Sequence, residues 1–312
     1  MRALQRGAQV QHASLGQGKV VAADPQALHV FFPGSRSRFA AKLRLPEAMR
    51  FLRLDGFEPD GPLQELSAFA FDEQAGRWGL HASWLPREEA IARYRARGAR
   101  RTRTGAPERR DRWALATQRW SAHLGGAALG RLLDAGDVEG AVRRIVALER
   151  FAAPLLGQAD QGALAAALAD PATAAAFLTA LVPVLEGAAP GRARVEALFR
   201  ASHALPGAPE QRWLVATLLP FVAAPGGHVL LRPRATAHAL ERLGIAFAPG
   251  DAPAWATYAA LRATSAGLLE ALAPHGAEDF ADVECFLHFT ATTTAREPGR
   301  GGARRAEDGS GS

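Results

Sequence analysis

Residues 7–21 read GAQVQHASLGQGKVV, and residues 28–34 continue with LHVFFPG. Two short runs of strand type flank the turn at 14–18, which contains two glycines. Residues 38–43 alternate between apolar and polar side chains. Four or five strands within roughly 40 residues predict a small, strongly bent sheet or barrel. Alternation in its third strand gives two faces, with Leu28, Val30 and Phe32 facing inward and His29 and Phe31 facing outward.

This segment resembles the Tudor-like, SH3-like barrel at the C-terminus of UvrD/PcrA-type helicases. The family pattern is V-x-H, a short turn to F-G-x-G-x-V, an alternating strand that ends in V-x-F, and a closing strand. Here Val10 and His12 open the pattern, Leu15 replaces the usual aromatic residue, and the match covers about 37 of the 312 residues. Bacterial polymerase-binding barrels of the CarD type are similar. The resemblance implies docking to RNA polymerase, and the alternative is a generic small barrel without that partner.

The motor of the helicase family does not accompany this module. A motor needs the phosphate-binding loop G-x-x-x-x-G-K-[ST], and neither Lys19 nor Lys42, the two lysines of the chain, lies in such a loop. ATPase and unwinding activities therefore do not carry over, and only the docking role remains. We expect a protein partner to contact the turns and outward side chains of the barrel, namely Lys19, His29, Phe31, Arg36 and Arg38.

Positive charge is concentrated between Arg87 and Arg112. This stretch holds ten arginines and four acidic residues, an excess that equals the net charge of +6 of the whole chain. Such blocks are usually solvated linkers. However, arginine binds phosphate bidentately and releases counterions, so weak, non-specific binding to DNA or RNA is the sharper hypothesis. Tyr94 and Trp113 would add stacking on exposed bases. The central residues of this hypothesis are Arg93, Arg95, Arg97, Arg100, Arg101 and Arg103.

The order of predicted elements gives an α+β fold, a small N-terminal SH3/Tudor-like β-barrel followed by a larger all-α domain. A short helix near 46–53 and a hairpin around 72–76 are consistent with the connecting region, and Pro86 before two glutamates favours a helix. From Arg112 onward, helical periodicity dominates, with starts at Asp170 and Pro209. We predict a barrel at 1–45, a connection at 46–85, an Arg-rich helix or linker at 86–112, an all-α domain at 113–292 and a disordered tail at 293–312.

The sequence lacks the residues that several kinds of chemistry require. The single cysteine, Cys285, excludes an internal disulfide and any zinc site with two thiolates, and the nine histidines lack metal-binding spacing. Cys285 and His288 would share a helix face, but apolar neighbours favour a buried, inert cysteine over a thiolate pair. There is no nucleophile motif. We therefore expect neither a metal nor a cofactor, and a non-enzymatic role is favoured.

An all-α enzyme or ligand-binding domain of unknown chemistry is the alternative function. Its ligand site would consist of His228, Arg232, Arg234, Trp255 and Tyr258. A third hypothesis is a scaffold that binds another protein through the helical half, which would require a large exposed apolar patch. The sequence lacks a signal-peptide pattern and a long apolar run, so we expect a cytoplasmic protein without a membrane partner.

Overall fold

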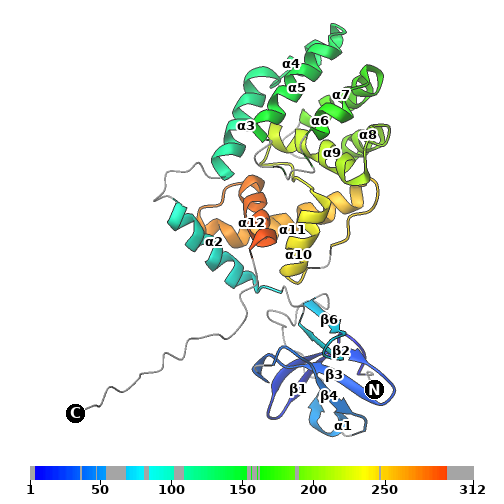
Figure 1. The fold of residues 1–312 in the computed structure, drawn as a ribbon, viewed down its shortest axis with the longest axis vertical. Helices are drawn as coiled ribbons and strands as arrows, with labels where there is room; N and C mark the ends of the chain where they lie inside the picture. Colours follow the sequence, from blue (N-terminus) through cyan, green and yellow to red (C-terminus); the bar gives the residue numbers. More distant parts are fainter. Residues whose placement is uncertain are drawn as a thin grey trace, which may run out of the picture.

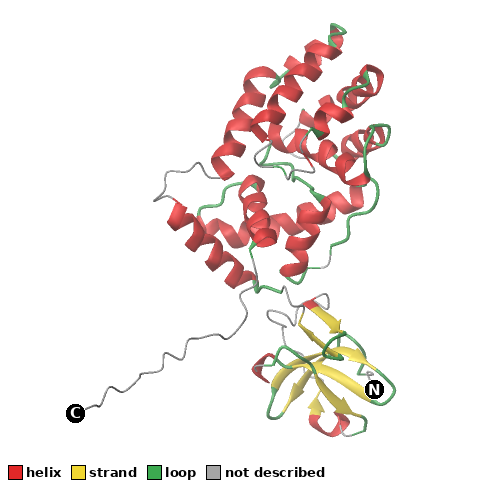
Figure 2. Ribbon diagram, viewed as in Figure 1, coloured by secondary structure: helices red, strands yellow, loops and turns green. Residues whose placement is uncertain are grey.

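The computed structural model describes residues 4–35, 37–46, 48–53, 68–80, 84–101, 109–152, 156, 160, 162–186, 190–245 and 247–293. Strands occupy the N-terminal part of the chain and helices the rest, and Figure 2 shows the two groups at opposite ends of the molecule. The α+β fold class is therefore confirmed. The predicted tail lies outside the described residues from residue 294 onward.

The N-terminal strands form a curled antiparallel sheet in the order β4-β3-β2-β1-β5 (Figure 1). The start of the second strand needs both of its glycines, because Gly16 has a φ of +74° and a β-carbon on Gly18 would lie 2.6 Å from the ring of Phe32. The fifth strand follows a short helix, so the sheet extends beyond residue 45. The elements are β1 (Gln9–His12), β2 (Gly16–Ala23), β3 (Ala27–Phe31), β4 (Ala41–Arg44), α1 (Ala48–Phe51) and β5 (Leu52–Arg53).

Both faces of this sheet are covered. The predicted inward set is confirmed, since Leu28, Val30 and Phe32 pack together in one buried cluster. The other face lies against a hairpin, β6 (Phe69–Asp72) and β7 (Arg77–Leu80), which the sequence also predicts. The hairpin is tied to the segment before β4, because the backbone N–H of Ala40 donates to the carbonyl of Trp78 at 2.8 Å. The outward face of β3 is therefore an interior surface.

Helices make up the remainder of the described chain. Asp170 caps α7 by accepting a hydrogen bond from the backbone N–H of Thr173 at 2.8 Å, as its position before a proline predicts. The helices are α2 (Arg87–Arg101), α3 (Arg109–His123), α4 (Ala128–Asp134), α5 (Val138–Ala152), α6 (Ala163–Ala167), α7 (Pro171–Leu185), α8 (Arg192–Ser202), α9 (Pro209–Ala223), α10 (Pro233–Arg242), α11 (Trp255–Leu272) and α12 (Phe280–Thr292).

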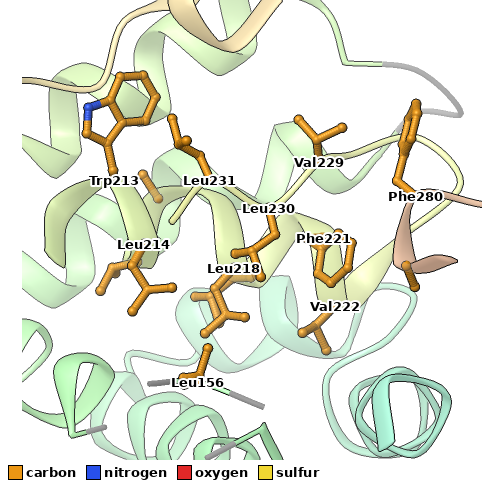
Figure 3. Close-up of a cluster of buried hydrophobic side chains, with 14 of the residues drawn as sticks. Leu156, Trp213, Leu214, Leu218, Phe221, Val222, Val229, Leu230, Leu231 and Phe280 are labelled. Carbon is orange, nitrogen blue, oxygen red and sulfur yellow. The ribbon is translucent and has the colours of Figure 1, made fainter. Parts of the chain in front are cut away.

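Helix α9 is the centre of the helical core. All residues from Trp213 to Val222 are buried, which is typical of a helix surrounded by other elements. Figure 3 shows its side chains packed with those of the extended segment 229–231 and with Phe280 of α12. The hydroxyl of Thr217 accepts a hydrogen bond from the backbone N–H of Leu231 at 3.0 Å. This segment leads directly into α10, so the core fixes the position of the first turn of α10.

The connecting region contacts the end of α10. The backbone N–H of Leu85 donates to the carbonyl of Arg242 at 2.6 Å. Gly244 has a φ of +75°, and a β-carbon there would lie 3.1 Å from the indole nitrogen of Trp84 and 3.3 Å from Ala68. These close contacts lie just before α2 and link the hairpin region to the helical part.

Candidate functional sites

Phe31, which we expected on the outer surface of the barrel, is buried. Its side chain is 2% exposed, and its ring lies 5.0 Å from that of Phe69. Lys19 is also buried, at 5% exposure. The alternation prediction holds, because Phe31 points away from Val30, but hairpin β6–β7 covers that second face. The expectation that Phe31 and Lys19 lie on the outer surface of the barrel is therefore wrong.

The other predicted contact residues have different surroundings. His29 is half-buried, with its Nε2 atom 3.4 Å from the carboxylate of Asp24. Arg38 is exposed and forms an ion pair with Asp72 of the hairpin. Arg36 lies outside the described residues. Of the described members of the set, Arg38 is the one that remains on the surface.

A different aromatic residue is exposed on the sheet module. Phe51 is 58% exposed, and its ring lies 6.2 Å from the ring of His12. We name Arg50, Phe51 and Arg53 the Phe51 surface, because all three are exposed. Leu52 points into the sheet core, so alternation within β5 turns Arg53 outward, and Phe51 is the last residue of α1. The sequence alone does not indicate which of these two apolar residues is exposed, because either Phe51 or Leu52 could pack in the core.

The arginine segment is a helix as far as residue 101. Arg95 and Arg97 are exposed, while Arg93 forms an ion pair with Glu89 one turn earlier. The guanidinium carbon of Arg97 lies 5.5 Å from the ring centre of Phe289. Arg100 and Arg101 belong to α2, but their side chains, like all of Arg103, lie outside the described residues. The segment is thus an ordered helix on α12, at least as far as Arg101.

The two aromatic residues expected to stack on bases both pack against other aromatic rings of the helical part. Tyr94 packs between Phe286 and Phe289, with ring centres 5.7 and 5.4 Å away. Trp113 is 1% exposed and lies edge-on against Phe221. Trp113 is therefore too buried for stacking on bases, whereas Tyr94 is half-buried with its ring packed on α12.

The five residues of the alternative ligand site differ in their burial and in their partners. His228 and Tyr258 are buried, with 3.0 Å between Nδ1 of the histidine and the tyrosine oxygen, and Trp255 packs on the tyrosine. Burial and the charge of Arg262 lower the pKa of His228 to about 4, and burial raises the pKa of Tyr258 to about 12. This pair is neutral at pH 7 and stabilises the core. Arg234 is exposed and pairs with Glu210 at 2.9 Å.

Arg232 instead joins a buried ion cluster around Glu284. Arg109 binds both carboxylate oxygens of Glu284, at 2.8 and 2.6 Å, and the indole N–H of Trp113 donates to one of them at 2.7 Å. Burial alone would raise the pKa of Glu284, but the charge and hydrogen bonds of Arg109 outweigh it and hold that pKa below its usual value. Arg232 reaches Glu284 at 3.7 Å and Asp160 at 3.2 Å. Arg109 and Glu284 are 175 residues apart, so local sequence patterns give no sign of this cluster.

A small hollow opens beside this cluster. It has a volume of about 20 Å³, enough for one or two water molecules, and it is open to solvent. Burial, followed by the charge of Arg109, lowers the pKa of His288 to about 4, so this imidazole is neutral at pH 7. The lining residues are Leu230, Arg232, Ala235, Thr236, Glu284, Leu287 and His288.

Cys285 carries no reactive chemistry in this structure. The thiol is buried, and burial raises its pKa well above the ordinary value, with the charge of Glu284 acting in the same direction. This supports the inert reading of the sequence over a thiolate pair. Within the described residues, no group of three histidine, cysteine or acidic side chains has an arrangement that could hold a metal ion.

Comparisons with known proteins give no assignment. A scan against protein-family models, a search of curated proteins and a search of solved structures each found no match. The resemblance of residues 7–34 to the helicase module therefore remains a prediction. In the described part of the chain, no helix has both the length and the apolar character needed to span a bilayer.

Proposed function

We propose that this chain is a non-enzymatic interaction protein that binds nucleic acid through α2, weakly and without sequence preference. The observation that carries the proposal is the anchoring of a basic helix. Tyr94 holds α2 on α12, while Arg95 and Arg97 stay exposed. A helix that is already ordered loses less conformational entropy when its arginines bind phosphates than a flexible linker would.

The spacing of the arginines supports a polyanionic partner. Arg93 and Arg97 are four residues apart, so they lie along one flank of α2. Arg95 lies on the opposite flank, so the helix presents positive charge on both sides. Successive phosphates along a strand match such a row, because each neutralised phosphate releases counterions.

Fluorescence anisotropy with a labelled 20-base-pair duplex tests this proposal. We expect the triple variant R93S/R95S/R97S to bind at least about tenfold more weakly than wild type at about 50 mM salt. The matched control is R143S/R192S/R234S, which removes three exposed arginines that also pair with glutamates. The proposal fails if the two triple variants lose the same affinity or if neither loses any.

We further propose that the sheet module is a Tudor-like barrel that binds a protein partner, with RNA polymerase as the candidate that the resemblance names. The contact surface shifts from Phe31 to the Phe51 surface, together with Arg38. An exposed aromatic residue between two arginines is a common type of interface anchor, and its truncation often costs about 2 kcal/mol or more of binding free energy.

A pull-down with purified bacterial RNA polymerase, after nuclease treatment, tests the sheet proposal. We expect Phe51→Ala to abolish co-purification and to leave the melting temperature unchanged. Phe71→Ala is the matched control, because Phe71 is also exposed, at 48%, but lies on the hairpin. If wild type does not retain polymerase, or if both variants behave like wild type, the sheet module has a different role.

A further inference from the structure

We propose that the hollow between α10 and α12 binds a small oxyanion, a phosphate group, through Arg232, Thr236 and His288. These side chains come from the segment before α10, from its first turn and from α12, and they line the same opening. The proposal does not depend on nucleic-acid binding by α2.

Arg232 provides the main positive charge at the hollow. Its side chain is 12% exposed, so the guanidinium is held in place by the surrounding protein but can still be reached from solvent. One N–H group points to Asp160 at 3.2 Å and another lies 3.7 Å from Glu284. A guanidinium has five N–H donors in a fixed fork, so donors remain for a ligand oxygen.

Two neutral donors lie beside this arginine. The hydroxyl oxygen of Thr236 accepts a hydrogen bond from the backbone N–H of Arg232 at 3.2 Å, which leaves its own proton to donate. The His288 ring is neutral at pH 7 and carries one N–H group. Ala235 lines the hollow from the first helical turn, where backbone N–H groups have no partner within the helix.

The charges around the hollow favour an anion. Glu284 is already satisfied, because Arg109 binds both its oxygens and Trp113 binds one. Asp160 offsets part of the charge of Arg232. The His288 ring is nevertheless influenced by the positive charges of Arg109, Arg232 and Arg97 and by the negative charge of Glu284. An oxyanion at the opening therefore meets the guanidinium of Arg232 and two neutral hydrogen-bond donors.

The size of the hollow limits the ligand. With a volume of about 20 Å³, the hollow admits one or two oxygens of a phosphate group, and the rest of the ligand must lie outside. The same chemistry fits free inorganic phosphate and a terminal phosphate of a nucleic acid. The test must therefore separate these two sources.

Thermal unfolding with inorganic phosphate, compensated with chloride to constant ionic strength, tests the site. Phosphate bound only to the folded state raises the melting temperature by mass action. We expect this rise for wild type and for Arg234→Gln, whose arginine lies two positions away on the exposed surface. For Arg232→Gln the apparent affinity should fall about tenfold or more, the usual effect of losing a charge-assisted hydrogen bond.

A second variant keeps the test decisive if Arg232→Gln does not fold. Thr236→Val removes one donor with little change of volume and should weaken phosphate binding severalfold. Competition between inorganic phosphate and oligonucleotides with a 5′-phosphate or a 5′-hydroxyl then identifies the source. Competition by the 5′-phosphate oligonucleotide alone assigns a terminal phosphate, and competition by neither assigns free phosphate. If phosphate stabilises wild type and both site variants equally, or stabilises none, the proposal is overturned.

Discussion

At the scale of single residues, Gly18 determines how closely β2 approaches the ring of Phe32. A β-carbon there would lie 2.6 Å from two ring atoms and 2.9 Å from the carbonyl of Phe31. Gly16 has a different constraint, because nothing lies within 4 Å of its added β-carbon but its φ is +74°. The two glycines at the start of β2 are therefore required for two different reasons.

This difference gives a prediction for the sheet module. Gly18→Ala should lower the free energy of unfolding by about 1–3 kcal/mol through overpacking, and Gly16→Ala by about 1–2 kcal/mol through backbone strain. Adding Phe32→Leu should recover part of the loss in the Gly18 variant and none in the Gly16 variant. Urea unfolding monitors both. Equal recovery in the two backgrounds would show that the ring contact is not the cause.

A second prediction at this scale concerns the buried His228. Its pKa of about 4 in the folded state lies below the ordinary 6.5, so the unfolded state binds a proton first as the pH falls. The stabilisation is complete above pH 6.5 and is lost between pH 6.5 and about 4, a change of about 3 kcal/mol. His288 acts in the same direction. Urea unfolding at several pH values should show a shallower decline for His228→Gln, and an unchanged decline would exclude this residue as the source.

At the scale of elements, Tyr94 decides whether α2 stays on α12. Ala90 and Ile91 of α2 are also buried, but Tyr94 is the residue whose ring contacts both Phe286 and Phe289 of α12. Tyr94→Ala should release the helix, so trypsin should cleave within α2 much faster than in wild type. Tyr94→Phe keeps the ring and should resist trypsin like wild type. Resistance of both variants would mean that α2 does not depend on this anchor.

The elements also show what the sequence predicts and what it omits. The hairpin, the helix after Pro86 and the inward set of β3 follow from alternation and turn residues, which are local signals. The burial of Phe31 depends on Phe69, 38 residues later in the sequence, and the Arg109–Glu284 pair spans 175 residues. Neither contact has a periodic signature. Contacts at long range decided which predicted side chains remained available for binding.

Across the whole molecule, the exposed surface is better suited to bind a partner through charged side chains than through apolar ones. Among the described residues, the large exposed hydrophobic side chains are Leu45, Phe51, Phe71 and Leu115, and Leu115 alone belongs to the helical half. A scaffold that binds through a large apolar patch of that half therefore gains no support. The excess of positive charge instead lies in and around α2. The distribution of charge thus favours a polyanion as the partner of α2.

The salt dependence of duplex binding tests that claim most directly. If four to six phosphates are neutralised, the logarithm of affinity should fall against the logarithm of salt concentration with a slope of about −4 to −5. Changing the six central arginines of the segment to serine should remove most of this slope without unfolding the protein. An unchanged slope in the variant, or a slope near zero in wild type, would contradict nucleic-acid binding by α2.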